Sequence, residues 1–210
     1  FVLCLGFKSD YVKKYFLTRR YLANDFLIAG DSEPEILSST PKDNWKIRLI
    51  DTGEESMTGC RIAQAMDRYD DGFEHFGVTY GDGLCNLDIS AEFRFHLDHG
   101  SVGTITGVNP VSRFGQIDAE GNTVQKFMEK PKLNDEWING GYFFFKKEFR
   151  SYLSDKSTCV LEREPLVKLT EDGSLRVYKH SDFWRCMDTQ RDKEELDGMF
   201  AEGKINWLTT

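Results

Sequence analysis

The pattern of apolar and polar positions switches repeatedly between a period of two and a period near 3.6, which predicts strands alternating with helices. Short apolar runs bounded by glycine or charged residues are typical of buried strands. They occupy residues 1–5, 45–51, 73–80, 102–108, 138–145, 175–178 and 183–187. Apolar residues at helical spacing predict helices at residues 10–20, 58–69, 90–99, 162–170 and 189–203. Such alternation predicts an α/β fold, a Rossmann-like, mostly parallel mixed sheet with helices on both faces.

The domain organisation follows from the length. A chain of 210 residues without repeats or low-complexity segments suits a single domain over residues 1–210. Within it, residues 183–210 form a terminal strand and helix. The hairpin expected at residues 117–129 turns at Ala119-Glu120-Gly121-Asn122, where glycine and asparagine favour a turn.

Charge and cysteine content limit the possible partners and location. The formal net charge of −8 argues against nucleic-acid binding, which usually needs a basic surface. No apolar run is long enough to cross a membrane, so no membrane partner is expected. The five cysteines form no CxxC pair, which favours reduced thiols and a cytoplasmic protein over a zinc site or disulfide framework.

Two aspartates follow predicted strands, where ligands bind in open α/β sheets. Asp82 stands between Gly81 and Gly83, and Asp188 directly precedes a predicted helix. Carboxylate oxygens suit Mg²⁺, and flanking glycines let a ligand approach the backbone. Asp82 can instead be a turn residue, and Asp188 with Thr189 can simply cap the helix.

Two further segments are candidates for ligand contact. Lys130, in a charged run that follows the hairpin, can meet a phosphate as a point charge, although such runs are usually solvated. Gly140-Gly141 inside a strand pattern indicates a bulge or a close ligand approach. By contrast, His96 and His99 favour packing over metal binding, since no third ligand accompanies them. Neither GxGxxG, GxxxxGK[ST] nor GxSxG occurs, so the motifs provide no protein nucleophile.

Taken in order, these segments resemble the sugar-1-phosphate nucleotidylyltransferases, most closely the glucose-1-phosphate cytidylyltransferases. The resemblance covers essentially the whole chain. The segments that carry it are Gly6-Phe7-Lys8, Leu49-Ile50-Asp51-Thr52-Gly53, Ser56-Met57-Thr58-Gly59-Cys60-Arg61, Tyr80-Gly81-Asp82-Gly83, Arg113-Phe114-Gly115, Glu129-Lys130-Pro131-Lys132, Ile138-Asn139-Gly140-Gly141, Glu164-Pro165-Leu166 and Phe183-Trp184 with Met187-Asp188-Thr189.

The resemblance implies a Mg²⁺-dependent transfer of a cytidylyl group from CTP to α-D-glucose 1-phosphate, giving CDP-glucose and pyrophosphate for surface polysaccharides. It implies that Asp82 and Asp188 are the magnesium carboxylates and that Lys130 contacts the sugar phosphate. Catalysis then rests on these three residues. Sugar contacts are implied for Glu129, Asn139 and Gly140. Nucleotide contacts are implied for Ser56, Thr58, Arg61 and Gly81.

The sequence differs from the family pattern at two places, and the resemblance leads to further expectations. Cys60 stands where the family usually has glycine, and a side chain there is expected to crowd a nucleotide-facing turn. The family's first strand and its glycine-rich triphosphate loop precede the point matched by Phe1, so this chain alone is expected to be impaired. A homo-oligomer is implied by resemblance only. The alternatives are a relative that uses UTP or dTTP and a non-catalytic protein that binds sugar nucleotides.

Overall fold

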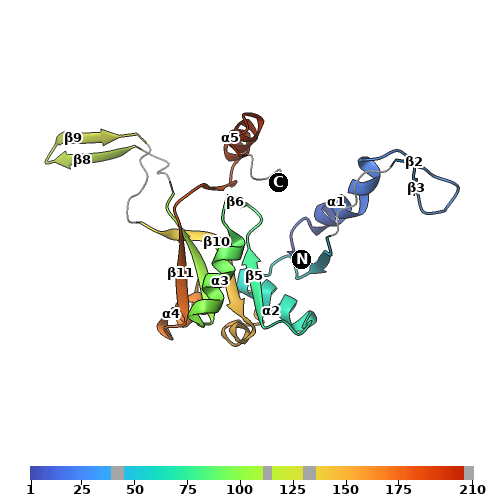
Figure 1. Cartoon of the computed structure of the whole chain (residues 1–210), viewed down its shortest axis with the longest axis horizontal. Helices are drawn as coiled ribbons and strands as arrows, with labels where there is room; N and C mark the ends of the chain where they lie inside the picture. Colours follow the sequence, from blue (N-terminus) through green and yellow to red (C-terminus); the bar gives the residue numbers. More distant parts are fainter. Residues whose placement is uncertain (39–44, 111–114, 130–135, 206–210) are drawn as a thin grey trace. The chain divides into compact units, whose positions relative to one another are not determined.

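A computed structural model describes residues 1–38, 45–110, 115–129 and 136–205. The chain divides into two compact units. Figure 1 shows their helices and strands, coloured along the sequence. Unit 1 comprises Phe1–Gly72 with Arg150–Lys168, and unit 2 comprises Phe73–Phe149 with Leu169–Thr210. The 3-10 helix η1 (Lys147–Tyr152) and the helix α4 (Glu164–Glu171) each continue from one unit into the other along the sequence.

Unit 1 is built on a parallel pair of strands and a helix. β1 (Val2–Leu5) pairs with β4 (Arg48–Asp51), with Leu5 opposite Asp51. The helix α2 (Thr58–Arg68) lies against β1 and buries one face, formed by Cys60, Ile62, Ala63 and Met66. This apolar stripe at helical spacing fixes which side of α2 faces the core.

The remaining elements of unit 1 are largely exposed. The helix α1 (Ser9–Leu22) has no buried residue. It is followed by a short antiparallel pair, β2 (Phe26–Leu27) and β3 (Glu35–Ile36). Many of the apolar side chains of this segment therefore remain in contact with solvent. Those with large exposure include Tyr11, Tyr15, Leu17, Leu22, Phe26, Leu27, Ile28 and Leu37.

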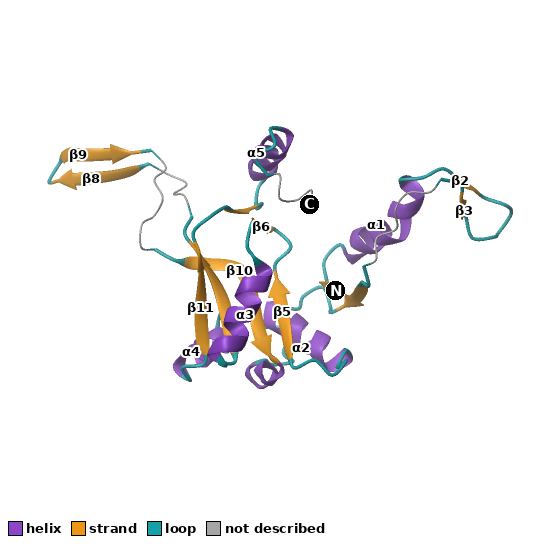
Figure 2. Cartoon of the chain, in the orientation of Figure 1, coloured by secondary structure: helices purple, strands orange, loops and turns teal. Residues whose placement is uncertain are grey.

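Unit 2 contains a four-stranded mixed sheet (Figure 2). Its order is β11 (Leu175–His180), β7 (Gly103–Val108), β10 (Ile138–Lys146) and β5 (His75–Thr79). β11 and β7 are parallel, whereas β10 is antiparallel to both of its neighbours. Three strands therefore run one way and β10 runs the other, so the sheet is mixed, as predicted, with one parallel and two antiparallel pairs.

The alternation of side chains along β10 places aromatic rings on both faces of this sheet. Phe144 faces the helix α3 (Ile89–His99), where its ring centroid lies 5.0 Å from that of Phe93. Phe145 points the other way and stacks on Phe149 of η1 at 3.9 Å. Both faces are thus covered by helical segments, as the sequence pattern predicts.

Buried polar side chains attach α3 to β7. Thr106 donates a hydrogen bond of 2.5 Å to Glu92 Oε1, and Thr104 Oγ1 lies 2.8 Å from both His96 Nδ1 and His99 Nε2. Glu92 and His96 are almost fully buried, so the predicted packing role of His96 is confirmed. Glu92 Oε2 has no hydrogen-bond partner among the described residues.

Three smaller elements complete unit 2. β6 (Gly83–Cys85) and β12 (Trp184–Cys186) form a two-stranded antiparallel ribbon. The predicted hairpin is present as β8 (Gln116–Glu120) and β9 (Thr123–Met128). The helix α5 (Gln190–Ala201) follows β12.

Most of the predicted elements are present, but the start of one helix differs from expectation. The helix predicted from residue 90 begins at Ile89 and is capped by Asp88, whose Oδ1 accepts a hydrogen bond of 2.9 Å from Ala91 N, whereas Ser90 lies inside the helix. Aspartate and serine are equally good caps, so the sequence alone does not choose between them. Among the described helices, none has the length and apolar character needed to cross a membrane.

Glu92 generates a prediction about pH. Burial raises its pKa from 4.5 to about 7, against the lowering effect of the Thr106 hydrogen bond. Between these values the unfolded carboxyl ionises while the folded one stays protonated, so stability falls as pH rises. The free energy of unfolding should decrease by on the order of 3 kcal/mol across this pH range. We expect Glu92→Gln to abolish the decrease. Denaturant unfolding across this pH window measures it.

The control for that experiment is Glu74→Gln, which changes an exposed carboxylate of the same unit. Burial, together with nearby His75, His99 and Lys146, lowers the pKa of His96 to about 4, so this group makes stability fall as pH drops below 6.5. The wild type, Glu92→Gln and Glu74→Gln all share this effect of His96, so it cancels when their free energies of unfolding are compared at each pH. An unchanged pH slope in Glu92→Gln would contradict the prediction.

Candidate active site

The ribbon of β6 and β12 brings the two candidate aspartates to one place. Gly83 pairs with Cys186, and one step further Met187 N donates a hydrogen bond of 2.8 Å to Asp82 O. Asp82 and Asp188 are therefore held at the same end of the ribbon, although about a hundred residues separate them in the sequence. Both residues are exposed.

The structure bears on the alternative roles of these aspartates. Thr189 caps α5: its side chain accepts a hydrogen bond from Asp192 N, and the Asp192 carboxylate accepts one from Thr189 N. This reciprocal capping box does not use Asp188. The Asp188 carboxylate instead accepts a hydrogen bond of 3.3 Å from Cys186 Sγ. Within the described part of the chain, no group donates a hydrogen bond to the Asp82 side chain.

The glycine pair of β10 forms the predicted bulge. The register with β7 shifts between Asn139 and Phe143, and Gly141 has a φ of 80°. A Cβ on Gly140 would lie only 2.7 Å from Val108 Cγ1, so the close approach of these strands requires glycine there. Asn139 Oδ1 accepts a hydrogen bond of 2.9 Å from Gly141 N, which closes the bulge.

The bulge lies against the loop and the ribbon that carry the aspartates. Tyr80 N donates to Gly141 O at 3.1 Å, and Trp184 Nε1 donates to Gly140 O at 2.8 Å. The hydroxyl of Tyr142 donates to Gly83 O at 2.8 Å. The structure therefore brings together five of the residues implied by the resemblance. They are Gly81, Asp82, Asn139, Gly140 and Asp188.

Space for a ligand exists beside this cluster at Gly81. The residue is exposed, and a Cβ built on it would meet no atom within 4 Å. Trp184 belongs to a family motif that implies no role for its side chain, and no motif assigns a role to Tyr142. Their hydrogen bonds to backbone carbonyls follow no local pattern, so only the fold reveals them.

The segment around Lys130 is described only in part. Lys130 lies outside the described residues, as does Arg113 of the family motif. Glu129 is exposed at the end of the β8–β9 hairpin, and its Oε2 lies 3.2 Å from the position that a Cβ on Gly115 would take. The implied contact of Glu129 with the sugar and that of Lys130 with the sugar's phosphate group remain predictions.

The three other candidates belong to unit 1, where two of them bind protein groups. Thr58 Oγ1 accepts a hydrogen bond of 2.9 Å from Leu161 N and donates one of 3.2 Å to Glu162 Oε2. The Arg61 guanidinium donates hydrogen bonds to three protein oxygens. These acceptors are Leu5 O at 3.0 Å, Thr52 Oγ1 at 2.6 Å and Glu54 O at 3.2 Å. Ser56 is half-buried in the turn that follows Gly53.

The side chain of Cys60, which was expected from the resemblance to crowd a nucleotide-facing turn, is enclosed within unit 1. Its side chain is buried in unit 1, with Sγ 3.4 Å from Asp155 O. The neighbouring Gly59 is the position without space, because a Cβ there would lie 2.7 Å from Cys159 Sγ. The family departure at residue 60 is therefore accommodated inside the unit.

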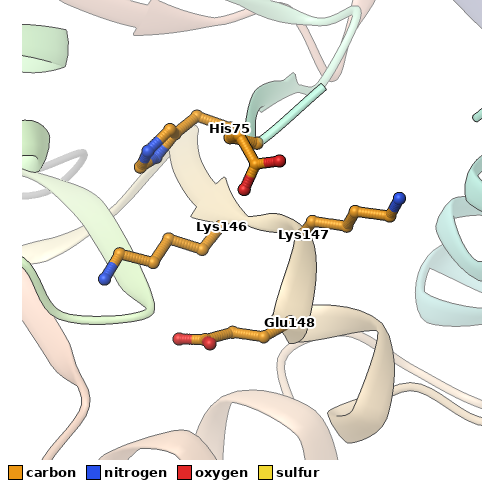
Figure 3. Close-up of a pocket in the computed structure, with 5 residues that line it drawn as sticks. His75, Lys146, Lys147 and Glu148 are labelled. Atoms are coloured by element: carbon orange, nitrogen blue, oxygen red, sulfur yellow. The ribbon is translucent and has the colours of Figure 1, made fainter. Parts of the chain in front are cut away.

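A cavity of about 600 Å³ in unit 2 contains none of the candidate residues (Figure 3). It is lined by Glu74, His75, Lys146, Lys147 and Glu148. His75 pairs with Lys146 at the amino end of β5, whereas the candidate cluster follows its carboxyl end. Because ligands in open α/β sheets bind beyond carboxyl ends, we place the candidate active site at the aspartate cluster.

Comparison with known proteins identifies the family of this chain. A family model described as "Nucleotidyl transferase" matches residues 23–189. The chain is 37% identical to the glucose-1-phosphate cytidylyltransferase of Salmonella typhi over 215 residues, which cover 100% of this chain and 80% of the relative. It is 29% identical over 172 residues to a catalytic subunit beta of mannose-1-phosphate guanylyltransferase from Danio rerio, covering 80% and 47% respectively.

A solved structure has the same fold. The crystal structure of HddC from Yersinia pseudotuberculosis superposes with a TM-score of 0.65 and 23% identity, covering 95% of this chain and 77% of the other. The family model and the 37% identity show that the protein belongs to the nucleotidyl transferase family. Within that family it is a member of the sugar-1-phosphate nucleotidylyltransferases, and the resemblance identified from the motifs is confirmed.

Proposed function

We propose that the protein transfers a cytidylyl group from CTP to α-D-glucose 1-phosphate, forming CDP-glucose and pyrophosphate. The observation that carries this proposal is the 37% identity with a protein of that name along the whole of this chain. The fold supports it, because the family's motif aspartates meet at one end of the β6–β12 ribbon.

We further propose that Asp82 and Asp188 hold Mg²⁺. The two residues fit this role, since both are exposed, oxygen-bearing and fixed at neighbouring positions by the Met187–Asp82 hydrogen bond. No third His, Cys, Asp or Glu joins them in a metal-binding group within the described residues, so phosphate oxygens and water would complete the shell. The bound ion would supply charge neutralisation at the reacting phosphates.

The chain's own residues would then act by binding and orientation. An oxygen of the sugar phosphate attacks the α-phosphorus of CTP in line, and pyrophosphate leaves, so no protein nucleophile is needed. Asn139 and Gly140 would meet the sugar hydroxyls, with Glu129 beside them and Lys130 on the sugar phosphate. Gly81, Ser56, Thr58 and Arg61 would position the nucleotide. Bringing two anions together in the correct geometry accounts for most of the rate enhancement.

The reaction would serve the synthesis of dideoxyhexoses for surface polysaccharides in the cytoplasm. Its reactants, a nucleoside triphosphate and a hexose phosphate, are intracellular metabolites. The five cysteines are all free thiols in the structure, which is consistent with a reducing compartment.

We also propose that the protein assembles as a homo-oligomer. The support is the exposed apolar segment of unit 1, in which α1 buries no residue and Tyr11, Leu17 and Leu22 are each more than two-thirds exposed. We expect a molar mass of at least two chains by light scattering with size-exclusion chromatography. Leu17→Glu with Leu22→Glu is expected to lower it, while Val167→Glu on α4 serves as control. A wild-type mass of one chain would contradict the proposal.

A nucleotide panel tests the base preference. With glucose 1-phosphate and Mg²⁺ present, we expect kcat/KM for CTP to exceed that for UTP, dTTP or GTP by at least about tenfold, because polar groups shaped for one base are left unpaired by another. Pyrophosphate release from the protein that carries this sequence provides the measurement. A preference for UTP or dTTP would instead support the related enzymes that use those nucleotides. Nucleotide binding without pyrophosphate release would support a non-catalytic protein that binds sugar nucleotides.

Substitution of the aspartates tests the metal assignment. We expect Asp82→Asn and Asp188→Asn each to lower kcat by roughly 100-fold or more, since charge stabilisation at the reacting phosphates is lost. Melting temperatures should stay close to wild type, because Thr189 and Asp192 cap α5 without Asp188. The control Asp197→Asn removes only an exposed ion pair of α5 with Lys193. Normal turnover with a lowered melting temperature in Asp188→Asn would show a structural role instead.

A further inference from the structure

We propose that Tyr142 and Trp184 are positioning residues that hold the sugar-binding bulge of β10 and the aspartate-bearing ribbon in a fixed relation. The inference rests on the proposed function, because it assigns these two side chains to the metal and sugar-phosphate site. Neither residue is expected to touch substrate. Each acts through a backbone carbonyl next to a candidate site residue.

The two hydrogen bonds run in opposite directions between the same segments. Trp184 belongs to the ribbon and donates from Nε1 to Gly140 O in the bulge at 2.8 Å. Tyr142 follows the bulge and donates from its hydroxyl to Gly83 O in the ribbon at 2.8 Å. Gly83 directly follows Asp82, so the Tyr142 hydroxyl fixes the backbone that carries this carboxylate.

The atoms around Gly83 show how tightly these groups meet. A Cβ built on Gly83 would lie 3.7 Å from Gly140 O, 3.8 Å from Tyr142 Cε2 and 3.9 Å from Trp184 Nε1. Three groups that come from two separate segments therefore converge on one glycine. This is ordinary packing distance, so the contact is complete without strain.

The ribbon depends on this junction for its position. Among the described strands, β6 and β12 pair only with each other, through three residue pairs. A two-stranded antiparallel pair of this size is marginally stable alone. Met187 N, which joins the two aspartate-bearing segments, lies just beyond the last of those pairs. A shift of the ribbon against β10 would therefore move both aspartates relative to Asn139 and Gly140.

The chemistry of the two donors suits a fixed support. Tyrosine and tryptophan side chains have two rotatable bonds, so holding them in one geometry costs little conformational entropy. Both are half-buried. Burial, as the main cause, raises the pKa of Tyr142 above its ordinary value, which keeps the hydroxyl protonated and able to donate. Supports of this kind around metal ligands typically change metal affinity or activity by 10- to 100-fold when removed.

The test removes each donor and keeps the ring. We expect Tyr142→Phe and Trp184→Phe each to weaken binding of Mn²⁺, used as the probe ion and followed by electron paramagnetic resonance, by roughly tenfold. In the same variants we expect kcat to fall by roughly 10- to 100-fold. The double variant should lose less than the product of the two single effects, because both bonds serve one junction.

Matched controls change the same residue types elsewhere. Tyr178→Phe alters a half-buried tyrosine of β11 whose ring packs edge-to-face with Phe95, and Trp45→Phe alters an exposed tryptophan of unit 1. Both controls should bind Mn²⁺ and turn over as wild type does. Melting temperatures of all variants separate a positioning role from loss of folded protein.

The outcomes distinguish this inference from the proposed function. Unchanged Mn²⁺ affinity in Tyr142→Phe and Trp184→Phe would overturn the inference, whether or not the melting temperature falls. The inference would also be overturned if the wild-type protein showed no Mn²⁺ binding that is lost in Asp82→Asn. Weakened Mn²⁺ binding in both variants, in a protein that transfers no cytidylyl group, would leave the inference standing and reject the proposed reaction.

Discussion

A single backbone hydrogen bond, from Met187 N to Asp82 O, underlies the candidate active site. It joins two segments about a hundred residues apart and places an aspartate from each at one end of the β6–β12 ribbon. A carboxylate pair can serve a shared cation only when the backbone fixes both members, since each flexible side chain that must be ordered costs entropy. The rest of the site in unit 2 is arranged around this link.

The strand β10 connects that link with the core. Along its second half, alternate phenylalanines fill both faces of the sheet, with Phe144 against α3 and Phe145 on Phe149. At its start the Gly140-Gly141 bulge breaks the register and turns two carbonyls toward Trp184 and Tyr80. One strand thus carries core residues at one end and site residues at the other, so the packing of the aromatic core limits movement at the site.

Unit 1 contributes candidate residues of a different kind. Arg61 donates hydrogen bonds to oxygens of its own unit, and Thr58 accepts one from a backbone amide of that unit. Cys60 is buried beside Asp155. The family motif at residues 56–61, for which the resemblance implies nucleotide contacts, therefore also stabilises the start of α2. A motif residue that has protein partners can still meet a ligand, since a guanidinium offers five donors and Arg61 uses three in the described structure.

The sequence by itself determined the elements and the family. Periodicity predicted most of the strands and helices, and the glycine pair of β10 indicated a bulge as one of two alternatives, because these features depend on neighbours a few residues apart. The order of short motifs identified the sugar-1-phosphate nucleotidylyltransferases. Only the tertiary structure decided that β6 pairs with β12, that Cys60 points inward, and that Tyr142 and Trp184 join ribbon to bulge. Those features depend on strand register and side-chain contacts between distant segments, which no local pattern encodes.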